Sequence, residues 1–275
     1  MPMTHAETVF IKLGGSLITD KTREATVRLD VIERLAREIR AALDGCSGLH
    51  LVLGHGSGSF GHFAARRYGV HRGVKGPQGW AGLAQTSAAA ARLNRLVTDA
   101  CLDAGVLVIA FQPSASALCR GGVLAQMAAH PVEEALSHGL VPLVYGDVAF
   151  DAEQGTAIIS TEDIFSYLAE SIVPSRILMV GVVDGVYEED PLRNPRSRCI
   201  PLITPDIFDE TKRGLGGSHG TDVTGGMLGK VSKLMPLVQR HRSMVVHFFS
   251  GEIPGRVTEA LLDGGAPFGT RLRAI

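Results

Sequence analysis

Short apolar runs alternate along the chain with longer stretches in which apolar residues recur at helical spacing. The first run, TVFIKL at 8–13, predicts a buried strand that ends at two glycines. A helix is expected from Asp30, whose side chain can cap free backbone N–H groups, with Glu33 completing a capping box. The next run, at 49–53, predicts a second strand that also ends at glycines. The chain therefore opens with a strand, a helix and a strand.

The same alternation continues to the C-terminus. Further strands are predicted at 106–111, 140–145, 176–181 and 244–249, and helices at 82–104, 131–138, 163–172, 224–240 and 254–262. Buried strands that alternate with helices are typical of an α/β fold, with a mostly parallel sheet covered on both faces. Ligands of such sheets bind beyond the C-terminal ends of the strands, and this chain has its glycine clusters there.

Two segments depart from this pattern. The stretch 69–80 combines glycines with basic residues and predicts a mobile loop. A change in composition at 147–156 separates an N-terminal half, to about 150, from a C-terminal half that begins at about 151. Since the sequence has no internal repeat and no low-complexity linker, the halves are expected to share one sheet within a single domain, 1–275.

The composition narrows the class of protein. With 275 residues, 45% hydrophobic and 20% charged, the chain can bury a sizeable core. A net charge of -1 gives no electrostatic attraction to nucleic acid or to an anionic membrane. The four cysteines show no CxxC spacing, the N-terminus lacks a signal-peptide pattern, and no apolar run is long enough to span a membrane. We therefore expect a cytoplasmic protein that binds neither nucleic acid nor membranes.

The first glycine-rich segment, KLGGS at 12–16, follows directly on the first predicted strand. Its two glycines allow the backbone to approach a ligand closely, and the N–H groups of such a turn can bind phosphate oxygens. Lys12 and Lys21 would add positive charge from two sides. Taken alone, the segment is equally compatible with an ordinary turn between a strand and a helix.

The second glycine-rich segment, GHGSGSFGH at 54–62, again follows a strand and precedes a helical pattern. The start of a helix favours negative charge, because its free N–H groups point outward. His62 stands where its imidazole can donate a hydrogen bond to a phosphate, and histidine changes charge near neutral pH. His55 is interpreted as a structural or supporting residue. The alternative for the segment is a flexible loop in which His62 has no function.

Two further segments are weaker when taken alone. DGVYEEDP at 184–191 follows the predicted strand 176–181 and reads as an acidic turn. GTDVTGGM at 220–227 is another glycine-rich helix start, with Lys230 about one turn further on. The sequence has no zinc-type cluster of Cys and His and no Walker pattern GxxxxGK[ST]. A kinase with this sequence would therefore not belong to the P-loop class.

The order of the four segments is far more specific than any one of them. KLGGS, GSGSFGH, DGVYEEDP and DVTGGMLGK, in this order, resemble the amino-acid kinase family over nearly the whole chain. Within that family, the continuation ITDK at 18–21 and the SFGH at 59–62 resemble the isopentenyl phosphate kinases. The resemblance implies a three-layer sandwich with a mostly parallel central sheet. It also implies ATP-dependent phosphorylation of isopentenyl phosphate to isopentenyl diphosphate in isoprenoid biosynthesis.

Two positions depart from the family pattern. Where the family has three glycines before SFGH, this chain has Ser57 in the middle, and we expect the loop to sit slightly differently because serine restricts positive φ. Where the family commonly has SGDD, this chain has STED at 160–163. Thr161 is expected to narrow the pocket or to add a hydroxyl contact. Asp163 is expected to be the carboxylate that organises the catalytic lysines.

The resemblance implies a role for each matching position. For phosphoryl transfer it implies Lys12, Lys21, His62, Asp163 and Lys230. For acceptor binding it implies Gly14, Gly56, Gly61, His62 and Thr161. For ATP it implies Lys12, Gly15, Ser16, Ser57, Asp184, Tyr187, Asp190, Gly225, Gly226 and Lys230. Mg²⁺ would accompany ATP without a direct protein ligand, and the N-terminal half would hold the acceptor while the C-terminal half holds the nucleotide.

The sequence leaves alternatives open. A fosfomycin-type phosphonate kinase would share the histidine and differ only in the pocket. A non-catalytic binding or storage protein on the same fold would have no need of four charged catalytic positions together. The alanines at 88–91 either leave room for a five-carbon tail or serve close helix packing. The family also implies a homodimer formed through the N-terminal halves, with the helix 82–104 as a candidate interface.

Overall fold

The computed structural model describes residues 7–189, 191, 194, 196–208 and 226–275. Its centre is an eight-stranded sheet in the order β10-β12-β11-β9-β1-β2-β6-β3. The strands are Glu7–Leu13 (β1), Leu49–His55 (β2), Val108–Ala110 (β3), Val141–Tyr145 (β6), Arg176–Gly181 (β9), Leu202–Ile203 (β10), Val245–Ser250 (β11) and Thr270–Leu272 (β12). The strands from β11 to β3 pair in parallel, while β12 runs antiparallel to β11. The predicted α/β class with a mostly parallel sheet is confirmed.

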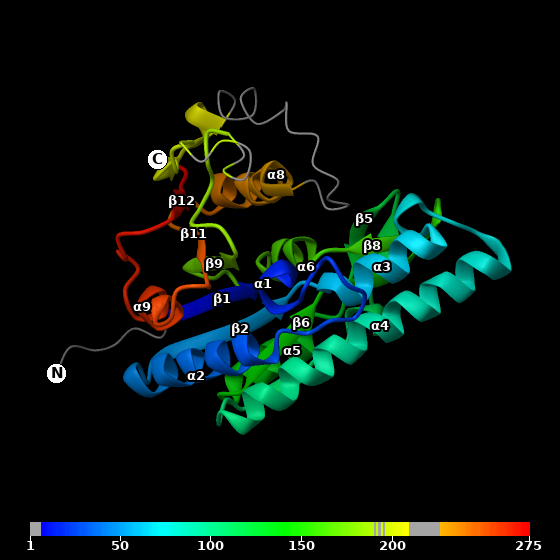
Figure 1. Ribbon diagram of the computed structural model, residues 1–275, viewed down its shortest axis with the longest axis horizontal. Helices are drawn as coiled ribbons and strands as arrows, with labels where there is room; N and C mark the ends of the chain where they lie inside the picture. Colours follow the sequence, from blue (N-terminus) through cyan, green and yellow to red (C-terminus); the bar gives the residue numbers. More distant parts are fainter. Residues whose placement is uncertain (1–6, 190, 192–193, 195, 209–225) are drawn as a thin grey trace.

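Helices cover both faces of this sheet and make three layers. They are Gly15–Ile18 (α1), Leu29–Gly45 (α2), Gly58–Tyr68 (α3), Gly76–Asp103 (α4), His130–Ser137 (α5), Thr161–Leu168 (α6), Gly226–Arg240 (α8) and Arg256–Leu262 (α9). Helices α2, α4 and α9 enclose one apolar core against the sheet, and α5, α6 and α8 enclose another. Figure 1 shows α2 and α9 on one side of the central strands and α8 on the other. None of the described helices is both long and apolar enough to cross a membrane.

Strand β1 shows how the sequence assigns side chains to the two faces. Successive residues of a strand point to opposite faces. The apolar residues at 9, 11 and 13 enter the core beneath α2 and α9. Phe10 faces the other core, where its ring lies 5.1 Å from the ring of Phe165 on α6. Lys12 follows Phe10 by two positions, so it lies on the face covered by α6 and α8, at the C-terminal end of the strand.

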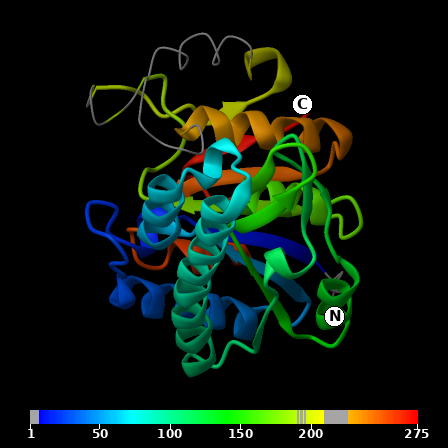
Figure 2. The same ribbon diagram turned by 90° about the vertical axis from the view of Figure 1, so that its right-hand side faces the viewer.

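A second, four-stranded sheet, in the order β5-β4-β7-β8, was not predicted. Its strands are Leu118–Arg120 (β4), Val123–Gln126 (β5), Asp147–Asp151 (β7) and Gly155–Ile159 (β8). The carboxylate of Asp151 joins the two hairpins, since it accepts backbone N–H groups from Gly121, Gly122, Glu153 and Gln154. Helix α4 packs along β7 and β8, and Figure 2 shows these green strands beside the cyan helices α3 and α4. Residue 150, the expected dividing point between the halves, lies inside β7.

Three predictions about elements need correction. The capping box expected from Asp30 and Glu33 is wrong, because α2 begins at Leu29 with Arg28 at its N-cap and no side-chain cap. The predicted loop at 69–80 is wrong in its second part, because α4 already begins at Gly76, and Val70–Arg72 form a short 3-10 helix before it. The backbone N–H of Val74 donates to Thr156, which ties this segment to β8. The strand expected at 106–111 is only Val108–Ala110 and lies at the edge of the sheet, where Ile109 is exposed.

Candidate active site

A cavity lies beyond the C-terminal ends of β1, β2 and β9, as parallel sheets predict. The turns that follow these strands, the start of α3, the start of α6 and the first turns of α8 line it. Eleven residues singled out from the sequence are among its lining: Lys12, Gly14, Gly15, Ser16, Lys21, Gly56, Ser57, Gly61, His62, Thr161 and Lys230. Segments far apart in the sequence therefore meet at one place.

The two glycine-rich turns touch each other through their backbones. A side-chain carbon at Gly15 would lie 2.6 Å from the backbone nitrogen of Gly58, and one at Gly56 would lie 2.9 Å from the nitrogen of Gly15. Both approaches are too close for any side chain, so glycine is required at positions 15 and 56. The N–H of Gly14 donates to Val180 on β9 over 2.7 Å, which joins the first turn to the C-terminal half.

Ser57 fits the second turn without backbone strain. Its φ of -70° and ψ of -10° are ordinary helical values, open to any residue. The left-handed conformation falls on the next residue, Gly58, with a φ of +51°. The serine that replaces a family glycine is therefore placed where φ is negative, so the restriction of positive φ expected from the sequence has no effect here.

Thr161, the second departure, is turned toward the protein rather than toward a ligand. Its hydroxyl donates to the carbonyl oxygen of His55 over 2.7 Å, and the residue is 1% exposed. Its methyl group occupies the space above Gly54, where a side-chain carbon would lie 2.6 Å away from it. Thr161 thus lines the cavity with a tightly packed side chain, and its hydroxyl donates its hydrogen to the protein backbone rather than to a ligand.

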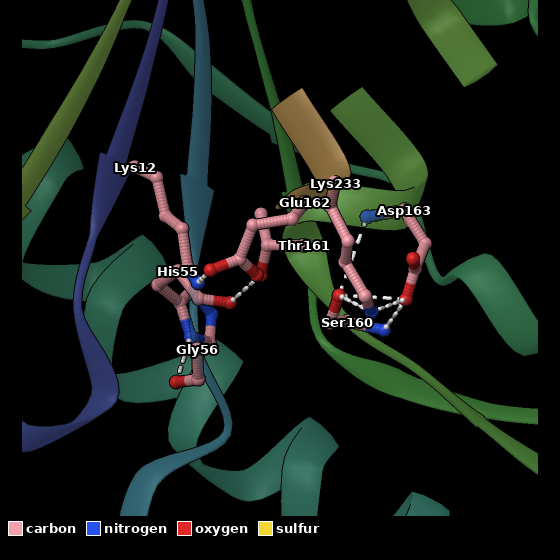
Figure 3. A network of polar contacts seen from close by, with 8 residues as sticks. All are labelled: Lys12, His55, Gly56, Ser160, Thr161, Glu162, Asp163 and Lys233. Carbon is pink, nitrogen blue, oxygen red and sulfur yellow. Dashed lines mark hydrogen bonds and ion pairs between the residues drawn. The ribbon is translucent and has the colours of Figure 1, made fainter. Parts of the chain in front are cut away.

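A buried ion pair joins β1 to α6 at the floor of the cavity (Figure 3). Lys12 Nζ lies 2.5 Å from Glu162 Oε1, and both side chains are almost completely buried. Burial alone would raise the pKa of Glu162, but the charges of Lys12 and Lys230 outweigh it and lower the pKa to about 2. Burial lowers the pKa of Lys12, Glu162 opposes this effect, and Lys230 and Lys233 add to the lowering. Two further lysine charges thus act on Lys12, and Glu162 supplies the buried counter-charge of Lys12.

Asp163, which the sequence predicts to organise the catalytic lysines, caps α6 and pairs with Lys233 rather than with Lys12. Its carboxylate accepts from the backbone N–H of Ser160 over 2.9 Å, and Ser160 Oγ accepts from the N–H of Asp163, so the two form a capping box at the start of α6. The same carboxylate also lies 2.8 Å from Lys233 Nζ. Successive residues of a helix point about 100° apart, so only one of these two acids faces β1. That residue is Glu162, which sequence reasoning missed.

The acceptor and nucleotide residues named from the sequence divide into three groups. His62, half-buried near the start of α3, and the exposed Lys21 both line the cavity. Asp184 and Tyr187 lie outside the lining: Asp184 is paired with Arg256, and Tyr187 forms a β-bridge with Cys199. Asp190 and Gly225 lie outside the described residues, and Gly226 is the first residue of α8.

A model of the amino acid kinase family matches residues 7–250. The chain belongs to the amino acid kinase family. Membership makes this amino acid kinase a phosphotransferase, with ATP as its co-substrate.

This amino acid kinase is similar to isopentenyl phosphate kinases over nearly its whole length. The enzyme of Methanothermobacter thermautotrophicus is 32% identical, over 96% of this chain and 98% of that one. The enzyme of Haloferax volcanii is 35% identical, over 90% of this chain and 97% of that one. A solved isopentenyl phosphate kinase structure superposes with a TM-score of 0.80 at 29% identity, over 96% of this chain and 100% of that one. The fold and the family predicted from the sequence are both confirmed.

Removing the charge of Glu162 should impair both stability and catalysis. Glu162→Gln leaves Lys12 buried beside Lys230 and Lys233 without its counter-charge, so we expect the free energy of unfolding to fall by about 3 kcal/mol. We expect turnover to fall at least about tenfold, because an uncompensated Lys12 gives up its proton or its position. Urea denaturation and steady-state kinetics measure the two effects.

The matched control is Asp163→Asn, one residue away, which disturbs the helix cap and Lys233 but leaves the Lys12 pair in place. It should keep more turnover than Glu162→Gln, and the reverse order would show that Asp163 is the organising acid.

The pKa of Glu162, about 2 in the folded protein, lies below its ordinary value of 4.5. Its contribution to stability is therefore complete above about pH 4.5 and is lost as the pH falls toward 2, a dependence that Glu162→Gln should lack.

Proposed function

We propose that this kinase transfers the γ-phosphoryl group of ATP to isopentenyl phosphate and forms isopentenyl diphosphate. The observation that carries the proposal is one cavity that combines Lys12, Lys21, Lys230 and His62 with an apolar end. The similarity to isopentenyl phosphate kinases over nearly the full length supports this acceptor over a phosphonate, and supports catalysis over mere binding.

Charge is the main requirement of the reaction. Two anionic phosphate groups must approach in line, and their repulsion must be offset by positive groups fixed in advance. Lys12 and Lys230 are suited to the transferring phosphoryl group, since they meet near Glu162 between the two halves of the chain. Lys21 and His62 are suited to the phosphate of the acceptor. No general base is required, because the attacking phosphate oxygen is already deprotonated near neutral pH.

The ATP side of the cavity is assigned to the C-terminal half. The turn after β9, at 181–183, lines the cavity together with Met227 and Lys230 of α8. We place Gly15, Ser16, Ser57 and Gly226 at the phosphates, where backbone N–H groups can donate. Asp184, Tyr187, Asp190 and Gly225 are proposed to surround the rest of the nucleotide.

A magnesium ion would fit this site through the nucleotide. Glu162 and Asp163, the acidic pair that begins α6, are held by Lys12 and Lys233. Among the described residues, no three His, Cys, Asp or Glu side chains gather into a metal site. We therefore propose that Mg²⁺ is bound through phosphate oxygens and water, and neutralises charge on the phosphates.

The acceptor side of the cavity is assigned to the N-terminal half and ends in an apolar wall. Ala65 of α3, Thr86 and Ala90 of α4, and Ile158 of β8 line this part. Thr86 presents little polarity, since its hydroxyl donates to the backbone oxygen of Gly82 over 2.8 Å. A short branched hydrocarbon tail gains by leaving water for such a surface, at about 25 cal/mol per Å². Of the alanines at 88–91, it is Ala90 that borders this space.

We also propose that two copies form a homodimer in the cytoplasm. Strand β3 is an edge of the central sheet, and its Ile109 is 40% exposed, with Leu107 beside it at 59% and Leu102 at the end of α4 at 44%. An uncovered edge strand with apolar side chains is a surface that proteins normally pair or cover. All four cysteines are free thiols, as suits a reducing compartment.

The acceptor is tested with purified protein, ATP and Mg²⁺ against isopentenyl phosphate, dimethylallyl phosphate, fosfomycin, UMP and acetylglutamate. We expect ADP release to be fastest with isopentenyl phosphate, and the product to be the diphosphate by mass spectrometry. If fosfomycin supports faster ADP release, or if isopentenyl phosphate does no better than a blank, the acceptor is wrong while membership of the kinase family stands.

His62→Ala should lower kcat/KM for the phosphate acceptor about ten- to a hundredfold, because a charge-assisted hydrogen bond contributes about 1.5–3 kcal/mol. His62→Gln retains an N–H donor and should keep more activity. The exposed His130 on α5 provides a control, and His130→Ala should leave the kinetics unchanged. Full activity of His62→Ala with a lowered melting temperature would assign His62 a structural role.

The homodimer is tested by light scattering at micromolar concentration. Wild-type protein should show about twice the chain mass of 29.2 kDa, and Ile109→Lys should yield monomers by placing charge at the sheet edge. Leu262→Lys, at an exposed position on α9, should leave the mass unchanged. A monomeric wild type, or a dimer unaffected by the Ile109 change, would refute this interface.

A further inference from the structure

His55, the last residue of β2, is a buried histidine that the proposed mechanism does not use. It is completely buried and does not line the cavity, although its neighbours Gly56 and Ser57 do. Leu51 and Leu53 of the same strand enter the core shared with α2 and α4, so the alternation of β2 turns His55 toward α4. Its ring stacks on the ring of Tyr145, with centroids 5.5 Å apart and planes inclined by 8°.

Both ring nitrogens of His55 have partners, and these define the tautomer. Nδ1 lies 3.1 Å from the carbonyl oxygen of Gly56, and a carbonyl can only accept, so Nδ1 carries the hydrogen. Nε2 lies 3.2 Å from the amide nitrogen of Asn94 on α4, which donates to it. Burial lowers the pKa of His55 to about 4, the Gly56 carbonyl opposes this, and the charge of Lys12 adds to the lowering. The ring is therefore neutral, with one donor and one acceptor, near neutral pH.

The hydrogen bond from His55 fixes the peptide group between Gly56 and Ser57. A peptide is planar and trans, so its C=O and the following N–H point in opposite directions. The Gly56 oxygen is held toward the ring of His55 (Figure 3), which turns the N–H of Ser57 away from the ring. The N–H of Gly56 is held as well, since it donates to Leu13 over 3.0 Å. Glycine is flexible by itself, and these two bonds remove that freedom at position 56.

The preceding peptide group is fixed in the same way. The carbonyl oxygen of His55 accepts from the N–H of Gly146 over 3.0 Å and from the hydroxyl of Thr161 over 2.7 Å. The backbone from 55 to 57 is thus held on three sides, by β6, by α6 and by the histidine ring. Since α3 begins at Gly58, the N–H groups of its first turn have no partner within the helix. Among them, the N–H of Ser59 donates to Thr19 Oγ1 over 2.9 Å, and Gly58, the first residue of the helix, lines the cavity.

We propose that His55 is a positioning residue for phosphoryl transfer, which holds the Gly56 carbonyl so that the Ser57 N–H points at the phosphate groups. Asn94 holds the ring in the tautomer that this requires. The inference rests on the proposed function, because it assigns Ser57 N–H to a phosphate of the reaction. It extends the machinery from the cavity to α4, through a side chain that touches no substrate.

Two substitutions separate hydrogen bonding from packing. His55→Phe keeps an aromatic ring that can stack on Tyr145 and removes the donor. His55→Asn loses the ring but keeps an N–H at the same number of bonds from Cα as Nδ1. We expect His55→Phe to lower kcat about tenfold or more, with little change in the KM of the acceptor. This fall in kcat is smaller than the fall caused by removing an oxyanion-hole donor altogether, because the Ser57 N–H is still present. His55→Asn should recover most of that kcat even though its melting temperature is lower.

The reverse order, with His55→Phe active and His55→Asn impaired, would make His55 a packing residue and overturn the inference. Asn94→Leu should also lower kcat, because Nε2 loses its donor, whereas Thr98→Val is the control on the same helix. The ratios are measured with whichever acceptor the wild type phosphorylates. An error in the acceptor alone therefore leaves this test intact, and a wild type inactive with every acceptor removes the proposed function and the inference together.

Discussion

A site that gathers anions needs positive charge that is fixed before the anions arrive, and the ion pair of Lys12 with Glu162 meets that constraint. Lys12 is buried, and burial opposes its charge, as does the proximity of Lys230 and Lys233. Glu162 offsets these effects at the floor of the cavity. The alternation of β1 sends Lys12 to the face covered by α6, and the cap of α6 leaves Glu162 facing it. The charge of Lys12 therefore depends on secondary structure on both sides of one contact.

The glycine-rich turns apply a second constraint, in which flexible residues are held by rigid neighbours. Gly15 and Gly56 allow two backbones to meet at distances that no side chain permits. Such turns would be mobile if left alone, since glycine has the widest conformational range. Here β9 holds the first turn through Gly14, and His55 and Leu13 hold the second through Gly56. Preorganised backbone donors result from packing around the turns and not from the turns themselves.

Much of this arrangement was predictable from sequence, for identifiable reasons. Strand β9 matches its predicted bounds at 176–181, because its apolar run is continuous and buried on both faces. The grouping of Lys12, His62 and Lys230 followed from the order of the motifs. Sequence reasoning named Asp163 and not Glu162, although a signal for the partner of Lys12 was present: Ser160 followed by an acid three residues later marks a helix cap. That pattern commits Asp163 to the cap and leaves its neighbour for the lysine.

The remaining differences involve short elements held by contacts distant in sequence. Strands β4 and β5 are three and four residues long, mostly exposed, and organised by the carboxylate of Asp151 from another hairpin. No local period marks them. Strand β3 reads as a buried apolar run, yet it lies at the sheet edge, because apolar composition does not show which strand ends a sheet. Such features depend on topology and not on local pattern.

The position of β1 between β2 and β9 bears on how the protein is made. Strand β1 is synthesised well before residues 176–181, with which it pairs on one side. An N-terminal half that folds during synthesis therefore exposes an open strand edge, with Lys12 near its end, until the C-terminal half has been synthesised. The cavity lies at the C-terminal ends of β1 and β9, where these two strands pair. The nascent chain consequently lacks a complete site until β9 docks, and a truncated product ending before β9 would carry an unpaired edge prone to aggregation.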